Sequence, residues 1–434
     1  MLIGLYLAVI AAPLGLAVAQ GDWRHEPVLD AIGSGLALVA FAVMCLDFTL
    51  SGRYRRVSGR IGFDRTMRLH RMGAYAMVAT AAIHPFFYRH PGAQDGPWFT
   101  GADPVLPVGL WSLAAGTGAW MTVTFLVLSA IDRDLLPCRY ATWQRLHAGG
   151  AVLAAALVAV HAITSGGYSS QPPLIAFWSV LLTIAGATLL YEHILRPWRQ
   201  QRAPYVVDTV DKVGANIWEV RLRPNPAGGR HTALRFRPGQ FAWLKLGGRA
   251  FGASEHPFSI STAPEDTPTI GFTIKEQGAF TGGVGAWQPG TPAYLDGPHG
   301  HFVPDEAPVP TVYIAGGVGI GPVVSHLRAF AARGDQRPIT LIYGTTTEAD
   351  IADRQELDDL AGVLDLTIHY VVAQPDAAWD GHAGRITPNV LDVCLPADRR
   401  ASARYFVCGP DAMMTAVHAS LRELGVPERR IIQG

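Results

Sequence analysis

"HRMGAYAMVATAAIHP" (residues 70–85) begins with a histidine and closes its apolar run with another, and "HAGGAVLAAALVAVHA" (residues 147–162) repeats the arrangement. In each stretch the two histidines are fourteen positions apart. On an α-helix, fourteen residues turn through about 1,400°, within roughly 40° of four full turns, and rise about 21 Å. Each stretch therefore predicts a helix that carries two histidines on one face, one near either end.

The first half of the chain has the composition of a membrane domain. The 434 residues are 49% hydrophobic and 16% charged, whereas soluble proteins are about 25% charged. Apolar segments near the roughly 20 residues that a bilayer requires lie at residues 2–20, 28–50, 69–88, 105–131, 147–165 and 174–195. We expect a bundle of six membrane helices. The first lacks a basic start, so we expect a retained helix rather than a signal peptide.

Arginine distribution predicts the orientation of these helices. Arginines are concentrated after the second, fourth and sixth segments, as in "SGRYRRVSGRIGFDRTMRLHR" (residues 51–71), and are few in the alternate connections. Such arginine-rich connections stay in the cytoplasm. The sequence therefore predicts an integral protein of a bacterial inner membrane with both termini in the cytoplasm. The net charge is zero, which gives no indication of nucleic-acid binding.

Because the third and fifth spans run in the same direction, their histidines should form two levels. His70 is expected beside His147 toward the cytoplasm, and His84 beside His161 toward the far side. Two imidazoles at one level can supply both axial ligands of a b-type haem. The chain has no CxxCH motif, so a covalently attached c-type haem is not expected. Arg68, Arg71 and Arg145 flank the cytoplasmic level and could meet haem propionates or serve as ordinary interfacial anchors.

Two other uses of these histidines stay open. A single histidine in a membrane helix is often a hydrogen-bonded packing residue, although ionisable groups there are usually functional. A metal-ion transport path would normally also recruit Asp, Glu or Cys. The third span between Met72 and Ile83 and the fifth between Ala148 and Val160 contain none of these. The paired spacing therefore favours haem.

The second half of the sequence predicts two soluble domains. Short segments broken by Gly and Pro, such as "IWEVRLRP" (217–224) and "TIGFTIKE" (269–276), predict strands of an antiparallel barrel. From "TVYIA" (311–315) onward, apolar strands alternate with helical segments, which predicts a parallel sheet of βαβ units. We expect a six-helix membrane domain over residues 1–200, a β-barrel domain over 201–307 and an α/β domain over 308–434.

A glycine-rich turn joins the first parallel strand to its helix in "YIAGGVGIGPVVSHL" (residues 313–327). Glycines let the backbone approach a pyrophosphate, and a helix N-terminus offers free N–H groups to it. Pro322 is a residue favoured at the first helical position, although it stands where GxGxxG would have its last glycine. A tight βα turn without a ligand is the alternative.

The order of "HPFSIS" (256–261), "GGVGIGP" (316–322) and "CGP" (408–410) resembles the ferredoxin–NADP reductase family. Together with six spans and paired histidines, the whole chain resembles the ferric reductase and NADPH oxidase superfamily. That resemblance implies two haem b, FAD, and NADPH or NADH as cofactors. It implies FAD contacts by His256, Pro257, Phe258, Ser259, Ile260, Ser261, Lys275, Gly278, Phe280 and Thr281. It implies nicotinamide nucleotide contacts by Gly316, Gly317, Gly319, Gly321, Pro322, Cys408, Gly409 and Pro410.

The same resemblance makes Ser259 and Cys408 the candidate catalytic residues, and His70, His84, His147 and His161 the iron ligands. It implies electron transfer from cytoplasmic NAD(P)H to an acceptor outside: oxygen giving superoxide, or alternatively a ferric chelate, a partner protein or a quinone. Arg89 and His90 could attract an anionic acceptor, although ordinary interfacial polar residues are the favoured alternative. Many NADPH-using relatives carry an arginine after the "LIYG" strand, where this chain has Thr345, Thr346 and Thr347. Arg354 is the nearest substitute, so NADPH is only weakly favoured over NADH.

Overall fold

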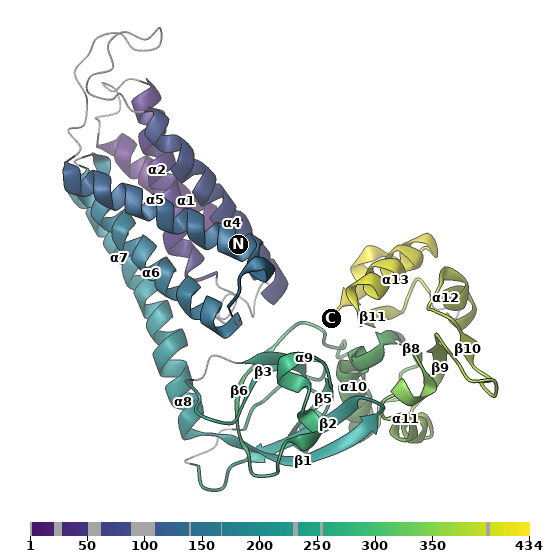
Figure 1. Cartoon of the computed structure of the whole chain (residues 1–434). Helices are drawn as coiled ribbons and strands as arrows, with labels where there is room; N and C mark the ends of the chain where they lie inside the picture. The colour runs from purple at the N-terminus through teal and green to yellow at the C-terminus, as the bar shows by residue number, and fades with distance from the viewer. Residues whose placement is uncertain are drawn as a thin grey trace. The chain divides into compact units, whose positions relative to one another are not determined.

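The computed structural model describes residues 2–20, 28–50, 62–87, 109–138, 140–165, 167–228, 233–251, 255–395 and 400–434. The chain divides into two compact units, Met1–Arg196 and Pro197–Gly434. The first is helical and the second contains two β-sheets (Figure 1).

Each apolar segment of the first unit contains one long helix in the described part of the chain. These helices are α1 (Leu2–Ala19), α2 (Val28–Asp47), α4 (Phe63–Ile83), α5 (Leu110–Ile131), α6 (Tyr140–Thr164) and α7 (Pro172–Leu190). A π-helical turn (Tyr191–Leu195) and α8 (Arg196–Arg202) continue from α7. Helices α4 and α6 begin six or seven residues before the expected starts at 69 and 147. Hydropathy detects only their apolar parts, whereas the helical hydrogen bonds continue through the polar first turns.

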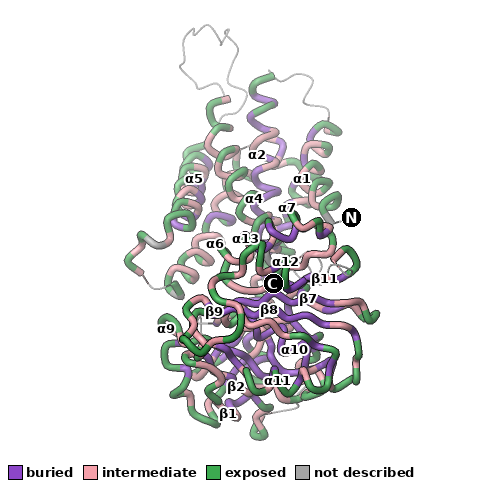
Figure 2. Tube along the Cα trace, turned by 90° about the vertical axis from the view of Figure 1, so that its right-hand side faces the viewer, coloured by how far each residue is buried: buried purple, intermediate pink, exposed green. Residues whose placement is uncertain are grey.

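Four of the described helices are long and apolar enough to cross a membrane: Val28–Asp47, Leu110–Ile131, Thr142–Thr164 and Pro172–Arg202. Helix α1 is apolar but shorter, over Ile3–Ala19. Helix α2 is largely buried, whereas the outer sides of α1 and α5 are exposed (Figure 2). Large apolar side chains lie on those exposed sides, including Trp111 at 83% exposure. Exposed apolar surface on this scale indicates contact with lipid.

The first sheet of the second unit is an antiparallel barrel. Its strands are β1 (Tyr205–Gly214), β2 (Ile217–Pro224), β3 (Phe241–Leu246), β4 (His256–Ser259), β5 (Ile270–Lys275) and β6 (Pro292–His299), in the order β4-β3-β6-β1-β2-β5. A bridge between Ile260 and Phe272 joins the two ends of that order and closes the barrel. Apolar side chains, among them Val220, Leu244 and Phe272, fill its interior.

The second sheet is parallel. Its strands are β7 (Thr311–Gly316), β8 (Ile339–Thr345), β9 (Leu366–Val372), β10 (His382–Ala383), β11 (Arg404–Cys408) and β12 (Ile431–Gln433), in the order β10-β9-β8-β7-β11-β12. Helices α10 (Gly321–Arg333) and α11 (Arg354–Ala361) cover one face, and α12 (Pro388–Cys394) and α13 (Asp411–Glu423) cover the other. Strand β8, which follows β7 in the chain, pairs with one edge of β7, and β11 pairs with the other edge. Ligands bind parallel sheets at the carboxyl ends of such switch-point strands.

A buried charge cluster joins the barrel to the parallel-sheet lobe. Arg328 of α10 donates hydrogen bonds to Glu219 of β2, to the carbonyl oxygen of Ser261 and to Glu356 of α11. Burial alone would raise the pKa of Glu219, but Arg328 and Arg221 more than offset it and lower that pKa. The cluster therefore holds an ionised carboxylate between the two lobes.

A buried histidine forms a second connection between the lobes. The His326 ring contacts the Tyr313 hydroxyl through Nδ1, at 2.8 Å. Its Nε2 donates to the carbonyl oxygens of Pro238 and Phe302, each at 3.1 Å. His326 is fully buried. Its hydrogen bonds tie α10 to the segments that flank the barrel strands.

Candidate functional site

His84 and His161 lie beside each other in the helical unit. His84 directly follows α4, His161 lies on α6, and their ring centroids are 6.5 Å apart with an interplanar angle of 67°. Nδ1 of His84 is 2.9 Å from the carbonyl oxygen of Ala81. Nδ1 of His161 is 2.9 Å from the carbonyl oxygen of Ser112 on α5. Because a carbonyl oxygen only accepts, each Nδ1 carries its hydrogen and the lone pair of each ring is on Nε2.

This geometry fits a metal held from two sides. Two imidazoles that bind one metal from opposite sides, at about 2.0 Å per bond, have ring centroids roughly 6.3 Å apart. Both ring planes then contain the metal–nitrogen axis, so the angle between them is unrestricted. A backbone carbonyl that fixes the remaining ring N–H is the usual partner of a metal-binding histidine. The His84–His161 pair therefore fits the axial ligands of a haem.

Close packing fixes the His161 ring further. A Cβ at Gly116 would lie 2.7 Å from Nδ1 of His161, so only glycine leaves room for the ring there. The Ser112 hydroxyl donates to the backbone carbonyl of His161 at 3.2 Å. Sequence patterns could not reveal these contacts because Ser112 and Gly116 lie on another helix.

His70 of α4 and His147 of α6 are the histidines of the second predicted level. In the described part of the chain, Nδ1 of each ring is buried without a hydrogen-bond partner. Asp47 at the end of α2 approaches His70, with Oδ2 3.7 Å from Nδ1. Gly73 gives that carboxylate room, since a Cβ there would lie 2.8 Å from Oδ1. Unpartnered buried imidazole nitrogens fit ligands of a second haem. Asp47 follows an uncharged run that begins after Asp30, and an acid at the end of such a run was the sequence signal that could have pointed to a contact with His70.

The three arginines proposed to flank the cytoplasmic level, Arg68, Arg71 and Arg145, have exposed side chains. Arg89 and His90 lie outside the described residues.

The proposed flavin segment is strand β4 and the turn that faces it. The His256 ring stacks on Phe280 of α9 (Gly278–Thr281), with centroids 4.0 Å apart. Phe258 also lies parallel to Phe280, at 6.2 Å. Burial lowers the pKa of His256, although Glu255 opposes the shift, so this ring is neutral near pH 7. Planar rings beside an extended strand fit a flavin.

Other members of the proposed flavin set differ in their surroundings. The Thr281 hydroxyl is hydrogen-bonded to the backbone of Gln277, and Lys275 is exposed at the end of β5. The side chains of Ile260 and Ser261 are fully buried, and the Ser261 hydroxyl donates to Glu219 at 3.0 Å. These two residues can reach a cofactor only through their backbone, because Ile260 packs in the barrel core and Ser261 lies against the buried charge cluster of Glu219 and Arg328.

Thr273 of β5 marks where the barrel meets the glycine turn, and sequence reasoning missed it. Its Oγ1 is buried and has no hydrogen-bond partner among the described residues. A Cβ at Gly321 would lie 3.2 Å from the Thr273 Cβ and 3.9 Å from the Ser259 Cβ. An unpartnered buried hydroxyl between β4, β5 and the turn fits a site that a cofactor completes.

The glycine turn and the "CGP" segment meet at the switch point of the parallel sheet. Gly316 ends β7, Gly317 and Gly319 form a 3₁₀ turn, and α10 begins at Gly321, one residue before the expected Pro322. A Cβ at Gly319 would lie 2.4 Å from the carbonyl oxygen of Cys408. The glycines thus allow the two segments to touch at the carboxyl edge of β7 and β11, where α10 begins, and a helix N-terminus at such an edge fits a dinucleotide.

Cys408 lies at this edge, followed by Gly409 and Pro410. Burial raises the pKa of the Cys408 thiol to about 11. The thiol is therefore protonated at neutral pH, and Cys408 can position a neighbouring group but does not act as a thiolate there.

The residues after β8 bear on nucleotide selectivity. The Thr345 hydroxyl donates to the carbonyl oxygen of Thr347, and the Thr347 hydroxyl donates to Asp350 at 2.8 Å. The Arg354 guanidinium lies over the rings of Tyr370 and Trp379, at 5.3 Å and 5.6 Å. The residue predicted to substitute for an arginine after β8 therefore packs on two aromatic rings.

Comparison with known proteins agrees with both units. Residues 36–165 match the ferric reductase like transmembrane component family, and residues 313–419 match the oxidoreductase NAD-binding domain family. The chain thus joins a ferric reductase like transmembrane component to an oxidoreductase NAD-binding domain, and its second half belongs to the ferredoxin–NADP reductase family.

The reductase module is similar to three curated proteins. Ferredoxin–NADP reductase B of Sorangium cellulosum is 30% identical over 207 residues, which cover 46% of this chain and 84% of that protein. NADH-cytochrome b5 reductase 1 of Laccaria bicolor is 32% identical over 158 residues, 35% of this chain and 51% of that protein. The propane 2-monooxygenase reductase component of Mycolicibacterium goodii is 30% identical over 226 residues, 50% of this chain and 62% of that protein.

This ferric reductase-type protein is therefore an oxidoreductase with an FAD- and NAD(P)H-binding module. Its N-terminal component is integral to a membrane.

Proposed function

We propose that this protein carries electrons across a membrane from cytoplasmic NAD(P)H to oxygen, which leaves as superoxide. When bound, FAD takes a hydride from NAD(P)H and two b-type haems relay its electrons singly. His70 and His147 would hold the haem nearer the flavin, and His84 and His161 the haem nearer the acceptor. The observation that carries the proposal is the 6.5 Å separation of the His84 and His161 rings.

In this proposal all six long helices of the described residues cross the membrane, in a bundle with both termini in the cytoplasm. Helix α4 carries Arg65, Arg68 and Arg71 near its start, which explains why composition alone does not select it as a span. The arginines after α2, α5 and α7 support the orientation. Three turns of α4 beyond Arg71 are apolar enough to enter the bilayer.

His84 and His161 together would hold the iron of the outer haem, which would supply electron transfer to oxygen without binding it. One NAD(P)H would then reduce two oxygen molecules to superoxide and release one proton. The same route would serve a ferric chelate, a partner protein or a quinone, since the acceptor would meet only the protein surface.

The test uses the full-length protein in detergent with FAD and either NADPH or NADH. We expect haem absorption to report anaerobic reduction. Air should then reoxidise the haems, with trapped superoxide formed at a rate comparable to NAD(P)H consumption. Reduced haem that persists in air but is discharged by a ferric chelate would instead make the protein a ferric reductase. If neither acceptor oxidises it, a partner protein or quinone is the acceptor. A protein without a haem spectrum would favour a metal transporter.

A further inference from the structure

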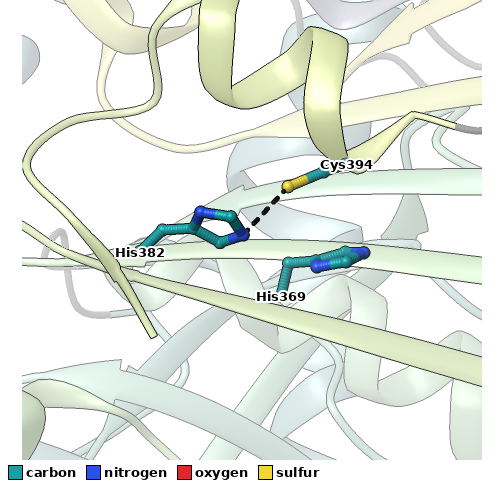
Figure 3. Close-up of side chains that lie close together, drawn as sticks. All are labelled: His369, His382 and Cys394. Carbon is teal, nitrogen blue, oxygen red and sulfur yellow. Dashed lines mark hydrogen bonds between the residues drawn. The ribbon is translucent and has the colours of Figure 1, made fainter. Parts of the chain in front are cut away.

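Three potential metal ligands converge at the outer edge of the parallel sheet. His369 comes from β9, His382 from β10 and Cys394 from the last position of α12 (Figure 3). One ligand atom from each lies within 4.8 Å of the other two. Nε2 of His382 is 3.3 Å from Sγ of Cys394, and the two histidine rings have centroids 5.8 Å apart. This cluster belongs to no cofactor segment described above.

The contacts around the three side chains give no structural reason for placing two histidines beside a cysteine. Cys394 is 4% exposed and packs with Leu391 and Val371 in the core on the α12 side of the sheet. His369 is on the same face of β9 as Val371, because alternate residues of a strand share a face. Among the residues that the structure describes, no hydrogen bond reaches the His369 ring, and no carboxylate or arginine pairs with either histidine. Two half-buried imidazoles and a buried thiol thus face one another with one hydrogen bond among them.

We propose that His369, His382 and Cys394 bind one zinc ion. A thiolate with two imidazoles is a ligand set that zinc favours, and three protein ligands leave a fourth position for water. In a tetrahedral site with bonds of about 2.3 Å to sulfur and 2.0 Å to nitrogen, ligand atoms are roughly 3.3 to 3.6 Å apart. The 3.3 Å between Nε2 of His382 and Sγ of Cys394 already meets that spacing. The His369 ring has to move about 1 Å closer, within the reach of a side-chain rotation.

Zinc would take the place of the thiol hydrogen that now lies between Cys394 and His382. Binding therefore releases one proton, and the zinc charge becomes +1 with the thiolate attached. The ion would tie β10, which is two residues long, and α12, which is seven, to the longer strand β9. Short elements at a sheet edge gain most from such a link because few other contacts hold them.

The test measures metal content in the full-length protein purified without a histidine tag and without chelators. We expect one zinc per chain, counted separately from haem iron. Cys394→Ser, His369→Gln and His382→Gln should each weaken zinc binding at least about 100-fold. Cys138→Ser and His418→Gln are matched controls outside the cluster, and they should keep the zinc. Equal zinc in the wild type and in all three ligand variants would overturn the proposal.

X-ray absorption at the zinc edge supplies a readout that does not depend on folding differences between variants. One sulfur at about 2.3 Å and two nitrogens at about 2.0 Å are expected in the wild type. A first shell of oxygen and nitrogen only would show that zinc binds elsewhere. Copper retained in preference to zinc by the same three residues would overturn the assignment of the metal. Zinc should also raise the temperature at which the wild type unfolds, and it should leave that of Cys394→Ser unchanged.

Discussion

His84 and His161 stand 6.5 Å apart, and each ring is held by a hydrogen bond from Nδ1 to a backbone carbonyl. One carbonyl belongs to the helix of the histidine itself and the other to a neighbouring helix. Ring orientation is therefore set by the backbone and requires no bound group. Preorganised ligands of this kind lose little conformational freedom when a cofactor binds.

Replacing His84 by Ala should remove about one haem per chain and leave the other. The haem between His70 and His147 would still be reduced by NAD(P)H, but electrons would not reach the external acceptor. Pyridine haemochrome analysis and anaerobic reduction measure the two effects. His418→Ala, at an exposed site paired with Glu428, is the control. Full haem content in His84→Ala would contradict the proposed ligand set.

Gly116→Ala should disturb the same haem without touching a ligand. The new methyl group would lie 2.7 Å from Nδ1 of His161 and push the ring away from the Ser112 carbonyl. We expect lower occupancy of this haem or a changed reduction potential, measured by redox titration of the haem spectrum. Gly118→Ala on the same helix is the matched control, because its methyl group meets Leu157 at an ordinary 3.4 Å. Equal spectra for both variants would show that Gly116 has no such role.

Gly319→Ala should weaken NAD(P)H binding while FAD content stays the same. Its methyl group would lie 2.4 Å from the Cys408 carbonyl oxygen and force the turn and β11 apart. The KM for the nucleotide should rise, which steady-state kinetics and flavin content together measure. Gly334→Ala, at the other end of α10, has open space around its Cβ and a φ of 63°. That control should lower stability by about 1 kcal/mol and leave KM unchanged.

Arg328→Met should destabilise the reductase module strongly. The side chains of Arg328 and Glu219 are 10% and 5% exposed, and removing one partner of a buried pair costs about 3–5 kcal/mol. Arg333→Met breaks the exposed pair with Glu265 and should cost at most about 1 kcal/mol. Release of flavin fluorescence on heating the full-length protein measures the difference. Similar transition temperatures for the two variants would contradict the role given to Arg328.

His326 should make the module less stable in mild acid. Burial lowers its pKa to about 3, against the opposing effect of its hydrogen bonds to Phe302 and Pro238. An unfolded histidine takes up a proton near pH 6.5, so between about pH 6.5 and 3 the unfolded state binds more protons. Stability therefore falls as pH drops through this window, by at most about 1.4 kcal/mol per pH unit.

The check compares the wild type with His326→Gln between pH 7 and pH 5, by the same fluorescence readout. The variant should be less stable at pH 7 but lose less stability on acidification. His418→Gln, on the surface, should keep the wild-type slope. Parallel slopes for the wild type and His326→Gln would refute the assignment.

The histidine levels were predictable because helical geometry alone relates positions fourteen residues apart. The proximity of His84 to His161 followed from two such helices running in one direction. Strands β1 to β9 and strand β11 could be predicted from alternating or continuous apolar runs in the sequence. By contrast, β10 and β12 are two and three residues long, too short for any period. They form only because a neighbouring strand supplies hydrogen bonds.

Contacts between segments that are distant in the chain could not be predicted from the sequence either. Asp47 meets His70, and Ser112 meets His161, through the packing of separate helices. Ile260 and Ser261 continue the flavin segment in sequence, yet both side chains are buried, Ile260 in the barrel core and Ser261 against Glu219. A motif match identifies a segment, whereas the burial of its side chains determines which of its atoms can contact a ligand.

The separation of His70, within α4, from His84, directly after it, has an electrical consequence. Fourteen helical residues separate them by about 21 Å, roughly two-thirds of the hydrocarbon thickness of about 30 Å. In the proposed orientation, an electron that travels from the His70 level to the His84 level moves outward, down a voltage that is negative inside. About 2.3 kcal/mol per 100 mV acts on a charge that crosses the whole membrane, so roughly two-thirds of that would drive each transfer. Turnover would thus carry an electric current across the membrane. The membrane voltage would accelerate this current, and the current would in turn reduce the membrane voltage.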